Sequence, residues 1–245
     1  PALGELDLGS MVNYFTPGFP TATERIVTYT RDLRTTAYSH ERIIFLEAMG
    51  RKPGWLALAS YKGNPDFILI PEVGLDYEAF LEKLLSHYKQ EKNAVVVVAE
   101  GLRYKGSETP ISEDPTNIDG FGHKKLGGVA EVLAKRVKQD LGIENCNHVN
   151  PGYLYRCGPP NFTDRQYALR LGNAAVDSIV AGETGRVAVL KKELECLVVR
   201  TMPIGQVLLT DCSGKVIPRT VDPRFYCPEN YSITQEGLQY FNFIK

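Results

Sequence analysis

Residues suited to binding an anion follow two short apolar runs. Residues 42–48 lead into Met49-Gly50-Arg51, and residues 93–99 lead into Glu100. Glycine lets the backbone approach a ligand closely, and arginine presents a planar fork to phosphate oxygens. A helix that begins at Trp55 would add free N–H groups near the same point. Met49-Gly50-Arg51 is therefore predicted to be an anion-binding turn.

A second arginine, Arg156, stands at another junction between elements. A short strand is predicted within 147–158, and Pro159-Pro160 then forces a turn before a helix expected over 164–181. The sequence thus places two arginines where strands give way to helices, which is a common position for phosphate ligands.

The elements that must position these residues alternate between strand and helix. Such alternation predicts an α/β fold with a Rossmann-like parallel sheet and helices on both faces. Ligands of these sheets collect at the carboxyl ends of the strands. Strands are expected over 42–48, 66–71 and 93–100, and helices over 21–36, 55–62 and 77–89.

The remaining segments contain fewer chemical signals. Residues 102–120 are rich in Gly, Pro and polar residues, which predicts a loop. Helical spacing over 124–141 predicts a helix that includes Gly127-Gly128 and stops at Gly142. Repeated prolines beyond residue 200 predict an irregular tail over 201–245.

The bulk properties favour a soluble globular protein. The chain has 245 residues, 43% of them hydrophobic, and a formal net charge of -1, so neither nucleic acid nor anionic lipid is an expected partner. The apolar runs are too short to span a membrane, and the N-terminus has no signal-peptide pattern. We expect a soluble compartment, either the cytoplasm or an organelle.

The five cysteines do not form a recognisable framework. They are odd in number and include no CxxC pair, which argues against a zinc knuckle and a complete set of disulfides. We expect reduced, mostly buried thiols.

Several segments resemble, in order, those of the phosphofructokinases. The resemblance rests on Met49-Gly50-Arg51, Ser39-His40-Glu41-Arg42, the run into Glu100, and Lys125-Leu-Gly-Gly-Val-Ala-Glu131. It implies the second, sugar-phosphate-binding domain of that family, together with an incomplete first domain. The implied activity is phosphoryl transfer from ATP or pyrophosphate to fructose 6-phosphate.

The resemblance also implies roles for individual residues. Met49, Gly50 and Arg51 would form the family's sugar-phosphate turn, and Glu100 would bind a sugar hydroxyl. Arg156 matches a phosphate-binding arginine. Arg42 matches an arginine that reaches the site of a neighbouring subunit, so an oligomer is implied.

Other positions depart from the family pattern. Glu5 stands where the family has its catalytic aspartate, and a displacement of about 1 Å can cost roughly a hundredfold in rate. Asp7 remains as a carboxylate for Mg²⁺. Tyr153 replaces the expected histidine, and residues 146–150 lack the second subunit-crossing arginine.

The family's glycine-rich loops for the phosphoryl donor have no counterpart in these residues. We therefore expect a sugar-phosphate-binding domain over 17–153, a remnant of the donor domain in 1–16 and 154–200, and the tail 201–245. A complementary donor-domain chain, another subunit, or a further portion of the same polypeptide is the expected partner.

Three functions remain open from the sequence. The chain could be a phosphofructokinase-like subunit that binds fructose 6-phosphate or a related sugar phosphate without transferring phosphoryl alone, which the departures favour. It could be the catalytic part of a split or processed enzyme that makes fructose 1,6-bisphosphate with a partner chain. It could also be a purely structural subunit. An unrelated Rossmann-like nucleotide binder is disfavoured because no dinucleotide fingerprint follows a strand.

Overall fold

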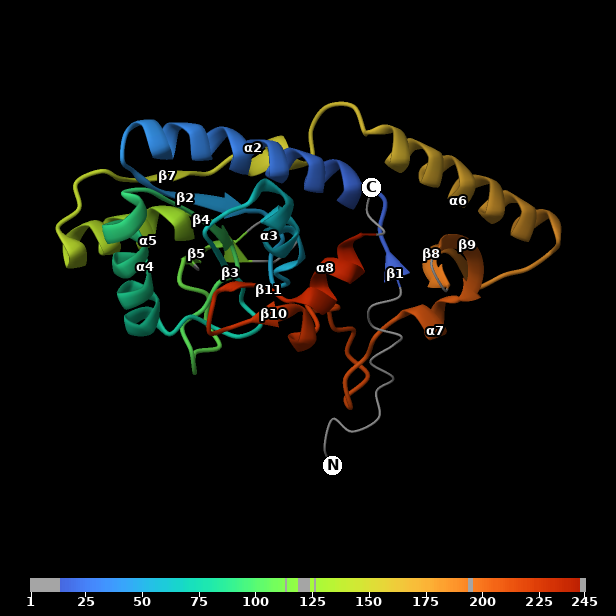
Figure 1. The fold of residues 1–245 in the computed structure, drawn as a ribbon. Coiled ribbons are helices and arrows are strands. Elements are labelled where there is room, and N and C mark those ends of the chain that lie inside the picture. The colour runs from blue at the N-terminus through green and yellow to red at the C-terminus, as the bar shows by residue number, and fades with distance from the viewer. Residues whose placement is uncertain (1–13, 113, 119–123, 126, 194–195, 243–245) are drawn as a thin grey trace. The chain divides into compact units, whose positions relative to one another are not determined.

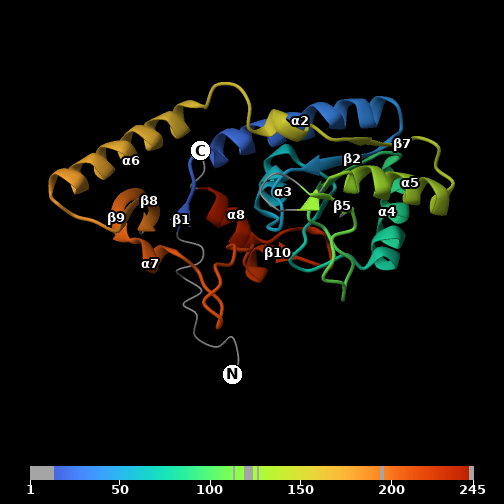
Figure 2. The ribbon, with the colours of Figure 1, turned by 180° about the vertical axis from the view of Figure 1, so that it is seen from behind.

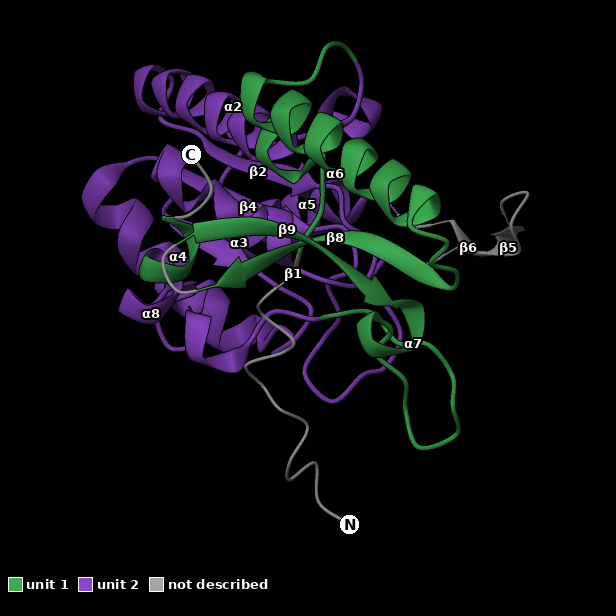
Figure 3. Cartoon of the chain, turned by 90° about the vertical axis from the view of Figure 1, so that its right-hand side faces the viewer, with its two compact units in different colours: residues 1–21, 158–219, 239–245 green, residues 22–157, 220–238 purple. Residues whose placement is uncertain are grey.

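The chain forms two compact units, which are coloured separately in Figure 3. The computed structural model describes residues 14–112, 114–118, 124–125, 127–193 and 196–242. We call residues 22–157 with 220–238 the sheet unit, and the described residues within 1–21, 158–219 and 239–245 the hairpin unit. The chain enters the hairpin unit after residue 157 and returns to the sheet unit at residue 220.

A four-stranded parallel sheet lies at the centre of the sheet unit (Figure 1). Its order is β3-β4-β2-β7, and it is parallel throughout. The strands are β2 (Ile43–Ala48), β3 (Phe67–Leu69), β4 (Ala94–Ala99) and β7 (Cys146–Val149). Every residue of β2, β3 and β4 is buried, as expected for strands covered on both faces. The predicted α/β fold with a Rossmann-like parallel sheet is confirmed.

Helices cover both faces of this sheet (Figures 1 and 2). Helices α4 (Tyr77–Glu91) and α5 (Val129–Leu141) pack on the face that carries Ile43 and Phe45. Helix α2 (Phe19–Ser39) packs through Ala37 on the face that carries Ile44. Helix α3 (Trp55–Ala59) follows β2 and continues into the short 3-10 helix η1 (Ser60–Gly63). Alternate residues of β2 therefore serve opposite layers of the core.

The ends of α4 and α5 follow local chemistry. The Asp76 side chain accepts a hydrogen bond from the Ala79 N–H at the start of α4, and α5 stops at Gly142 in a left-handed conformation. The expected helix over 124–141 begins later, at Val129, because Gly127 and Gly128 both have positive φ. The expectation that these glycines lie inside the helix is therefore wrong. Two short strands, β5 (Asp114–Ile118) and β6 (Lys124–Lys125), pair before them.

Residues 220–238 return from the far end of the sequence to cover the β3 edge. The Ile68 N–H donates to the Tyr231 carbonyl at 2.7 Å, and the Tyr226 hydroxyl donates to the Ile68 carbonyl at 2.7 Å. Tyr231 also packs edge-on against Phe67 and Phe80. The backbone N–H and carbonyl of Ile68 on this edge strand are therefore both hydrogen-bonded. The segment contains η3 (Pro223–Phe225), β10 (Tyr226–Cys227), β11 (Ser232–Ile233) and the start of α8 (Gln235–Phe241).

The hairpin unit is built on an antiparallel sheet of order β1-β8-β9. Helix α6 (Phe162–Val180) packs on β8 and β9. The buried Asp164 carboxylate accepts the Gly18 N–H at 2.7 Å and the Thr21 N–H at 2.8 Å, so it caps the chain where α2 begins. The other elements of this unit are β1 (Tyr14–Phe15), β8 (Arg186–Glu193), β9 (Cys196–Pro203) and α7 (Ile204–Val207). Residues 201–245, expected as one irregular tail, thus carry short elements and are divided between the two units.

All five cysteines are free thiols. Cys146 is buried, and this burial raises the pKa of its thiol to about 12. The expectation of mostly buried cysteines is wrong, because Cys157, Cys196 and Cys212 lie exposed in loops or at the start of a strand.

Within the described part of the chain, no helix combines the length and the apolar character that crossing a membrane requires.

Candidate functional site

The carboxyl edge of the parallel sheet brings together most of the described residues predicted to bind a ligand. Strand β2 ends at Met49-Gly50-Arg51, and its neighbour β4 ends at Glu100. On the other side of β2, strand β7 ends just before Tyr153 and Arg156. Since the strands are parallel and adjacent, these three strand ends lie at the same edge.

The turn after β2 is held by Glu100. One carboxylate oxygen, Oε1, accepts the Gly50 N–H at 3.1 Å and the Arg51 N–H at 2.5 Å. Arg51 has a φ of 55°, which is unusual for a residue with a side chain. Its carbonyl oxygen lies against Gly101, where a Cβ atom would be only 2.0 Å away. Glu100 and Gly101 together therefore fix the backbone of the turn, while Gly50 and Arg51 remain exposed.

The loop after β7 presents Tyr153 and Arg156 to solvent. Residues Gly152–Tyr155 form the 3-10 turn η2, and the Arg156 guanidinium stacks over the Tyr153 ring at 4.8 Å from its centroid. Tyr155 is buried beneath the turn, and its hydroxyl donates to the Glu47 carbonyl at 2.8 Å. The buried tyrosine thus anchors a loop whose exposed face carries a cation.

Glu47 is a site-supporting residue that the sequence analysis missed. It is 2% exposed, and its carboxylate accepts the N–H groups of Gly128 and Ala130, each at 3.0 Å, and the Asn150 Nδ2 at 2.7 Å. Burial raises the pKa of this carboxyl above its ordinary value, against the lowering effect of the two backbone hydrogen bonds. The available signal was a single charged residue inside the apolar strand Ile43–Ala48.

Arg42 lies at the opposite edge of the sheet from the other predicted residues. It precedes β2, and its carbonyl accepts the Ala94 N–H at the start of β4. A strand of six residues is about 20 Å long. Arg42 therefore does not join Arg51 and Glu100 around one ligand within a single chain.

The predicted catalytic base Glu5 and the predicted metal carboxylate Asp7 lie outside the described residues. Among the residues that the structure describes, no group of three or more His, Cys, Asp or Glu side chains is placed to hold a metal ion.

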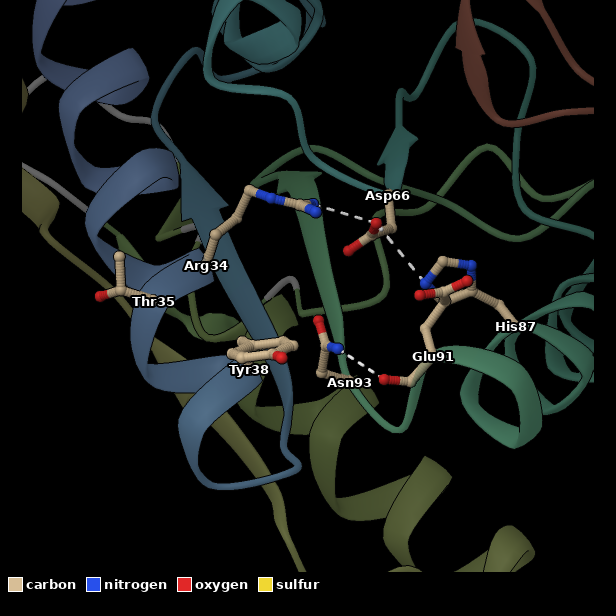
Figure 4. A pocket seen from close by; sticks show the side chains of 7 residues that line it. All are labelled: Arg34, Thr35, Tyr38, Asp66, His87, Glu91 and Asn93. Atoms are coloured by element: carbon tan, nitrogen blue, oxygen red, sulfur yellow. Dashed lines mark hydrogen bonds and ion pairs between the residues drawn. The ribbon is translucent and has the colours of Figure 1, made fainter.

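A pocket of about 600 Å³ opens at the amino edge of the sheet, away from the predicted site (Figure 4). Asp66 accepts from Arg34 at 3.0 Å and lies 3.5 Å from His87 Nε2. Its second oxygen accepts the Val95 N–H at 2.7 Å, which ties it to β4. None of the residues predicted to bind sugar phosphate lines this pocket, whose walls are Arg34, Thr35, Tyr38, Asp66, His87, Glu91 and Asn93.

Comparison with known proteins places the chain in one family. The family model described as phosphofructokinase matches residues 10–179. The chain is 40% identical over 215 residues to the pyrophosphate–fructose 6-phosphate 1-phosphotransferase of Dictyoglomus thermophilum, covering 86% of this chain and 58% of that protein. It is 37% identical over 177 residues to the ATP-dependent 6-phosphofructokinase of Chloroflexus aurantiacus, covering 71% of this chain and 47% of that protein.

Solved structures agree at the level of the fold. The pyrophosphate-dependent phosphofructokinase from Nitrosospira multiformis matches with a TM-score of 0.75 and 24% identity, over 96% of this chain and 58% of that one. The enzyme from Marinobacter aquaeolei gives a TM-score of 0.74, also at 24% identity, over 93% of this chain and 55% of that one.

The sheet unit is thus a Rossmann-like α/β unit whose carboxyl edge carries the predicted anion-binding residues. The chain belongs to the phosphofructokinase family. It spans about half the length of the relatives it matches, between 47% and 58% of the two named above.

Proposed function

We propose that this chain binds fructose 6-phosphate, or a related sugar phosphate, at the carboxyl edge of its parallel sheet. The observation that carries the proposal is the Met49-Gly50-Arg51 turn, pinned by Glu100 through two backbone hydrogen bonds. Arg51 would bind the phosphate as a fork, and Glu100 would accept a hydrogen bond from a sugar hydroxyl. Met49 would form an apolar wall beside the sugar ring.

Arg156 supplies the second cation of this proposed site. Its guanidinium lies over the Tyr153 ring, which limits the directions that the arginine samples before a ligand arrives. The Tyr153 hydroxyl could donate one hydrogen bond to phosphate, although it adds no charge. Two arginines and one hydroxyl match the needs of a phosphate monoester better than those of a neutral sugar.

Calorimetric titration of the chain with fructose 6-phosphate tests this proposal. We expect binding that weakens by about ten- to a hundredfold in Arg51→Gln, since a charge-assisted hydrogen bond contributes about 1.5–3 kcal/mol. Fructose without phosphate should bind weakly in both proteins. A wild-type chain that binds no fructose 6-phosphate, or an Arg51→Gln variant that binds it equally well, would contradict the proposal.

Arg42 would complete the site from a second copy of the chain. Its position at the amino edge supports a role outside its own site. Affinity for fructose 6-phosphate should then rise with protein concentration as copies associate. Arg42→Gln should remove that dependence while it leaves the binding seen at low concentration unchanged.

A complementary donor-binding part is the partner that we propose for the hairpin unit. Along α6, Phe162, Leu169, Val176 and Val180 follow one face at helical spacing, and each is more than half exposed. An apolar stripe of this kind is typical of a surface that another part covers. That part could be a separate chain or a further portion of the same polypeptide.

Phosphoryl transfer to fructose 6-phosphate would then be an activity of the completed protein. The relatives include a pyrophosphate-dependent and an ATP-dependent enzyme, so either compound could be the donor. Glu5, at the position of the family's catalytic aspartate, favours the reading that this chain does not transfer phosphoryl alone. The chain combined with a donor domain from a relative should be assayed with each donor and Mg²⁺. Turnover would favour a split enzyme, and binding without turnover would favour a non-catalytic sensing subunit.

A purely structural subunit is the remaining alternative. It predicts an assembly with other proteins and no sugar-phosphate binding that depends on Arg51. The titration described above separates this alternative from a sensing subunit.

A further inference from the structure

Glu47 connects the two parts of the proposed sugar-phosphate site. It belongs to β2, two residues before Met49, while its side chain reaches Asn150 at the end of β7. We propose that Glu47 is a positioning residue, which holds the loop 150–156 against β2 so that Arg156 and Arg51 face one ligand. The inference rests on the function proposed above, because it assigns both arginines to the same site.

The loop is tied to Glu47 at two points. At its start, Asn150 Nδ2 donates to the Glu47 carboxylate at 2.7 Å, and Asn150 Oδ1 accepts the Gly152 N–H at 2.9 Å. At its end, the Tyr155 hydroxyl donates to the Glu47 carbonyl at 2.8 Å. Tyr153 lies between these ties and Arg156 follows directly after them. The loop that carries the proposed phosphate arginine is therefore fastened to a single residue of β2.

The side chain at position 47 must be a hydrogen-bond acceptor, because the groups around it are donors. Both of its oxygens are buried, and all their partners are donors: the N–H groups of Gly128 and Ala130 and the amide of Asn150. The Gly128 N–H lies 3.0 Å from each oxygen, and the Ala130 N–H contacts Oε2. A neutral amide has one accepting atom and one donating group, so it cannot satisfy this set.

In Glu47→Gln, the new amide NH2 could face the Asn150 Nδ2, so that two donors oppose each other. Turning the Asn150 side chain over does not relieve this conflict. If the new amide donates toward residue 150, the Asn150 carbonyl must turn to accept it. The Asn150 Nδ2 would then face the Gly152 N–H, so two donors would oppose each other. The tie at the start of the loop consequently depends on an accepting side-chain oxygen at position 47, whereas the Tyr155 tie uses the backbone carbonyl and is kept in this variant.

Moving the carboxylate from position 47 to position 150 should restore the hydrogen bond between β2 and the loop. In the double variant Glu47→Gln with Asn150→Asp, the new amide oxygen can accept from Gly128 and Ala130. The new amide N–H can donate to one oxygen of the introduced carboxylate, whose other oxygen can accept from Gly152. The swap conserves the net charge, and the N–H groups of Gly128, Ala130 and Gly152 each have an acceptor again.

Hydrogen exchange followed by NMR provides a readout that does not require any ligand. The amides of Gly152, Leu154 and Arg156 are hydrogen-bonded within the loop. We expect them to exchange at least about tenfold faster in Glu47→Gln and in Asn150→Ala. The swap variant should return their exchange to within about twofold of wild type. Asn150→Ala keeps the carboxylate and both helix contacts, so it tests the loop even if Glu47→Gln folds poorly.

Fructose 6-phosphate affinity supplies the second readout. Glu47→Gln and Asn150→Ala should each lower it by at least about fivefold, their effects should not add, and the swap should recover it. Asp66→Asn is the matched control, since Asp66 is a mostly buried carboxylate that accepts a backbone N–H of the sheet at the opposite edge. It should lower thermal stability without changing loop exchange or affinity.

The possible outcomes distinguish a failure of the proposed function from a failure of the positioning role. A wild-type chain that binds no fructose 6-phosphate would overturn the proposed function, whereas the exchange rates would still decide whether Glu47 positions the loop. Normal loop exchange in Glu47→Gln and Asn150→Ala would overturn the positioning role. A swap that fails to restore loop exchange, or an Asp66→Asn variant with the same loop defect, would also overturn it.

Discussion

The backbone N–H of Arg51 donates to the Glu100 carboxylate at 2.5 Å, so the exposed turn after β2 takes its shape from the end of β4. The same oxygen accepts the Gly50 N–H. An arginine with positive φ would not hold this conformation without such support. The glutamate therefore has a structural role in the turn in addition to any contact with a sugar.

These two roles of Glu100 can be separated by two substitutions. Glu100→Gln keeps an oxygen that can accept both N–H groups, whereas Glu100→Ala leaves them without that partner. We expect Glu100→Ala to lower the free energy of unfolding by about 1 kcal/mol and fructose 6-phosphate affinity by about tenfold or more. Glu100→Gln should preserve stability. It should lower fructose 6-phosphate affinity only as far as the contact with the sugar hydroxyl is weakened. Equal stability losses in urea unfolding of the two variants would contradict this account.

Arg51→Gly should have opposite effects on stability and binding. An L-residue in the left-handed region costs roughly 1–2 kcal/mol, and glycine removes this cost while adding unfolded-state entropy of about 0.5–1 kcal/mol. The free energy of unfolding should stay unchanged or rise by up to about 1 kcal/mol. Affinity for fructose 6-phosphate should fall by at least about tenfold because the guanidinium is lost. A stability loss above about 1 kcal/mol would show that the Arg51 side chain stabilises the fold.

Gly101→Ala should disturb the turn from the side of β4, where Gly101 follows the end of the strand. The new methyl group would lie 2.0 Å from the Arg51 carbonyl oxygen, so the backbone of the turn must move. We expect a stability loss of about 1–3 kcal/mol, with weaker fructose 6-phosphate binding. Gly172→Ala is the matched control, because it lies within α6 and a Cβ there meets no atom within 4 Å. That control should gain about 0.5–1 kcal/mol.

Glu72→Gln should change how stability depends on pH. Burial raises the pKa of Glu72 above its ordinary value of 4.5, and its Oε2 accepts no hydrogen bond from the described residues. The folded chain therefore holds the Glu72 proton more tightly than the unfolded chain does. The stability contribution of this site is complete below pH 4.5 and is lost as the pH rises through the folded pKa.

The variant lacks this titration, so its stability relative to wild type should increase as the pH rises. Its amide oxygen can still accept the N–H groups of Gly54 and Val221, which Glu72 Oε1 accepts at 2.9 Å each. Urea unfolding of both proteins from about pH 4 to about pH 8 measures the difference. A difference that does not vary with pH would contradict the prediction.

Local patterns predicted the parallel sheet and the turn well. The strand expected over 42–48 is observed at Ile43–Ala48, and the helix expected over 77–89 is observed at Tyr77–Glu91. Apolar runs that end in polar residues reveal both the buried strands and the points at which they end. The resemblance of Met49-Gly50-Arg51 to one family is likewise confirmed at the level of the family.

The supporting contacts could not be predicted because they join residues that are far apart in the sequence. Glu47 contacts Gly128, Ala130 and Asn150, which follow it by 81, 83 and 103 residues. The N–H groups at the first turn of α5 likewise donate to this distant carboxylate. No local propensity indicates which buried charge will meet which helix.

Tyr231 is part of the same hydrophobic core as Phe67 and Phe80, although the whole hairpin-unit segment 158–219 separates it from them in the sequence. A ribosome adds Tyr231 only after that segment has been synthesised. The sheet unit cannot therefore complete its core until residues 220–238 have been synthesised, and until then its β3 edge lacks the hydrogen bond from Ile68 to Tyr231. An edge strand without its partner can pair with another chain, so the order of synthesis leaves the sheet unit open to misassembly until Tyr231 is in place.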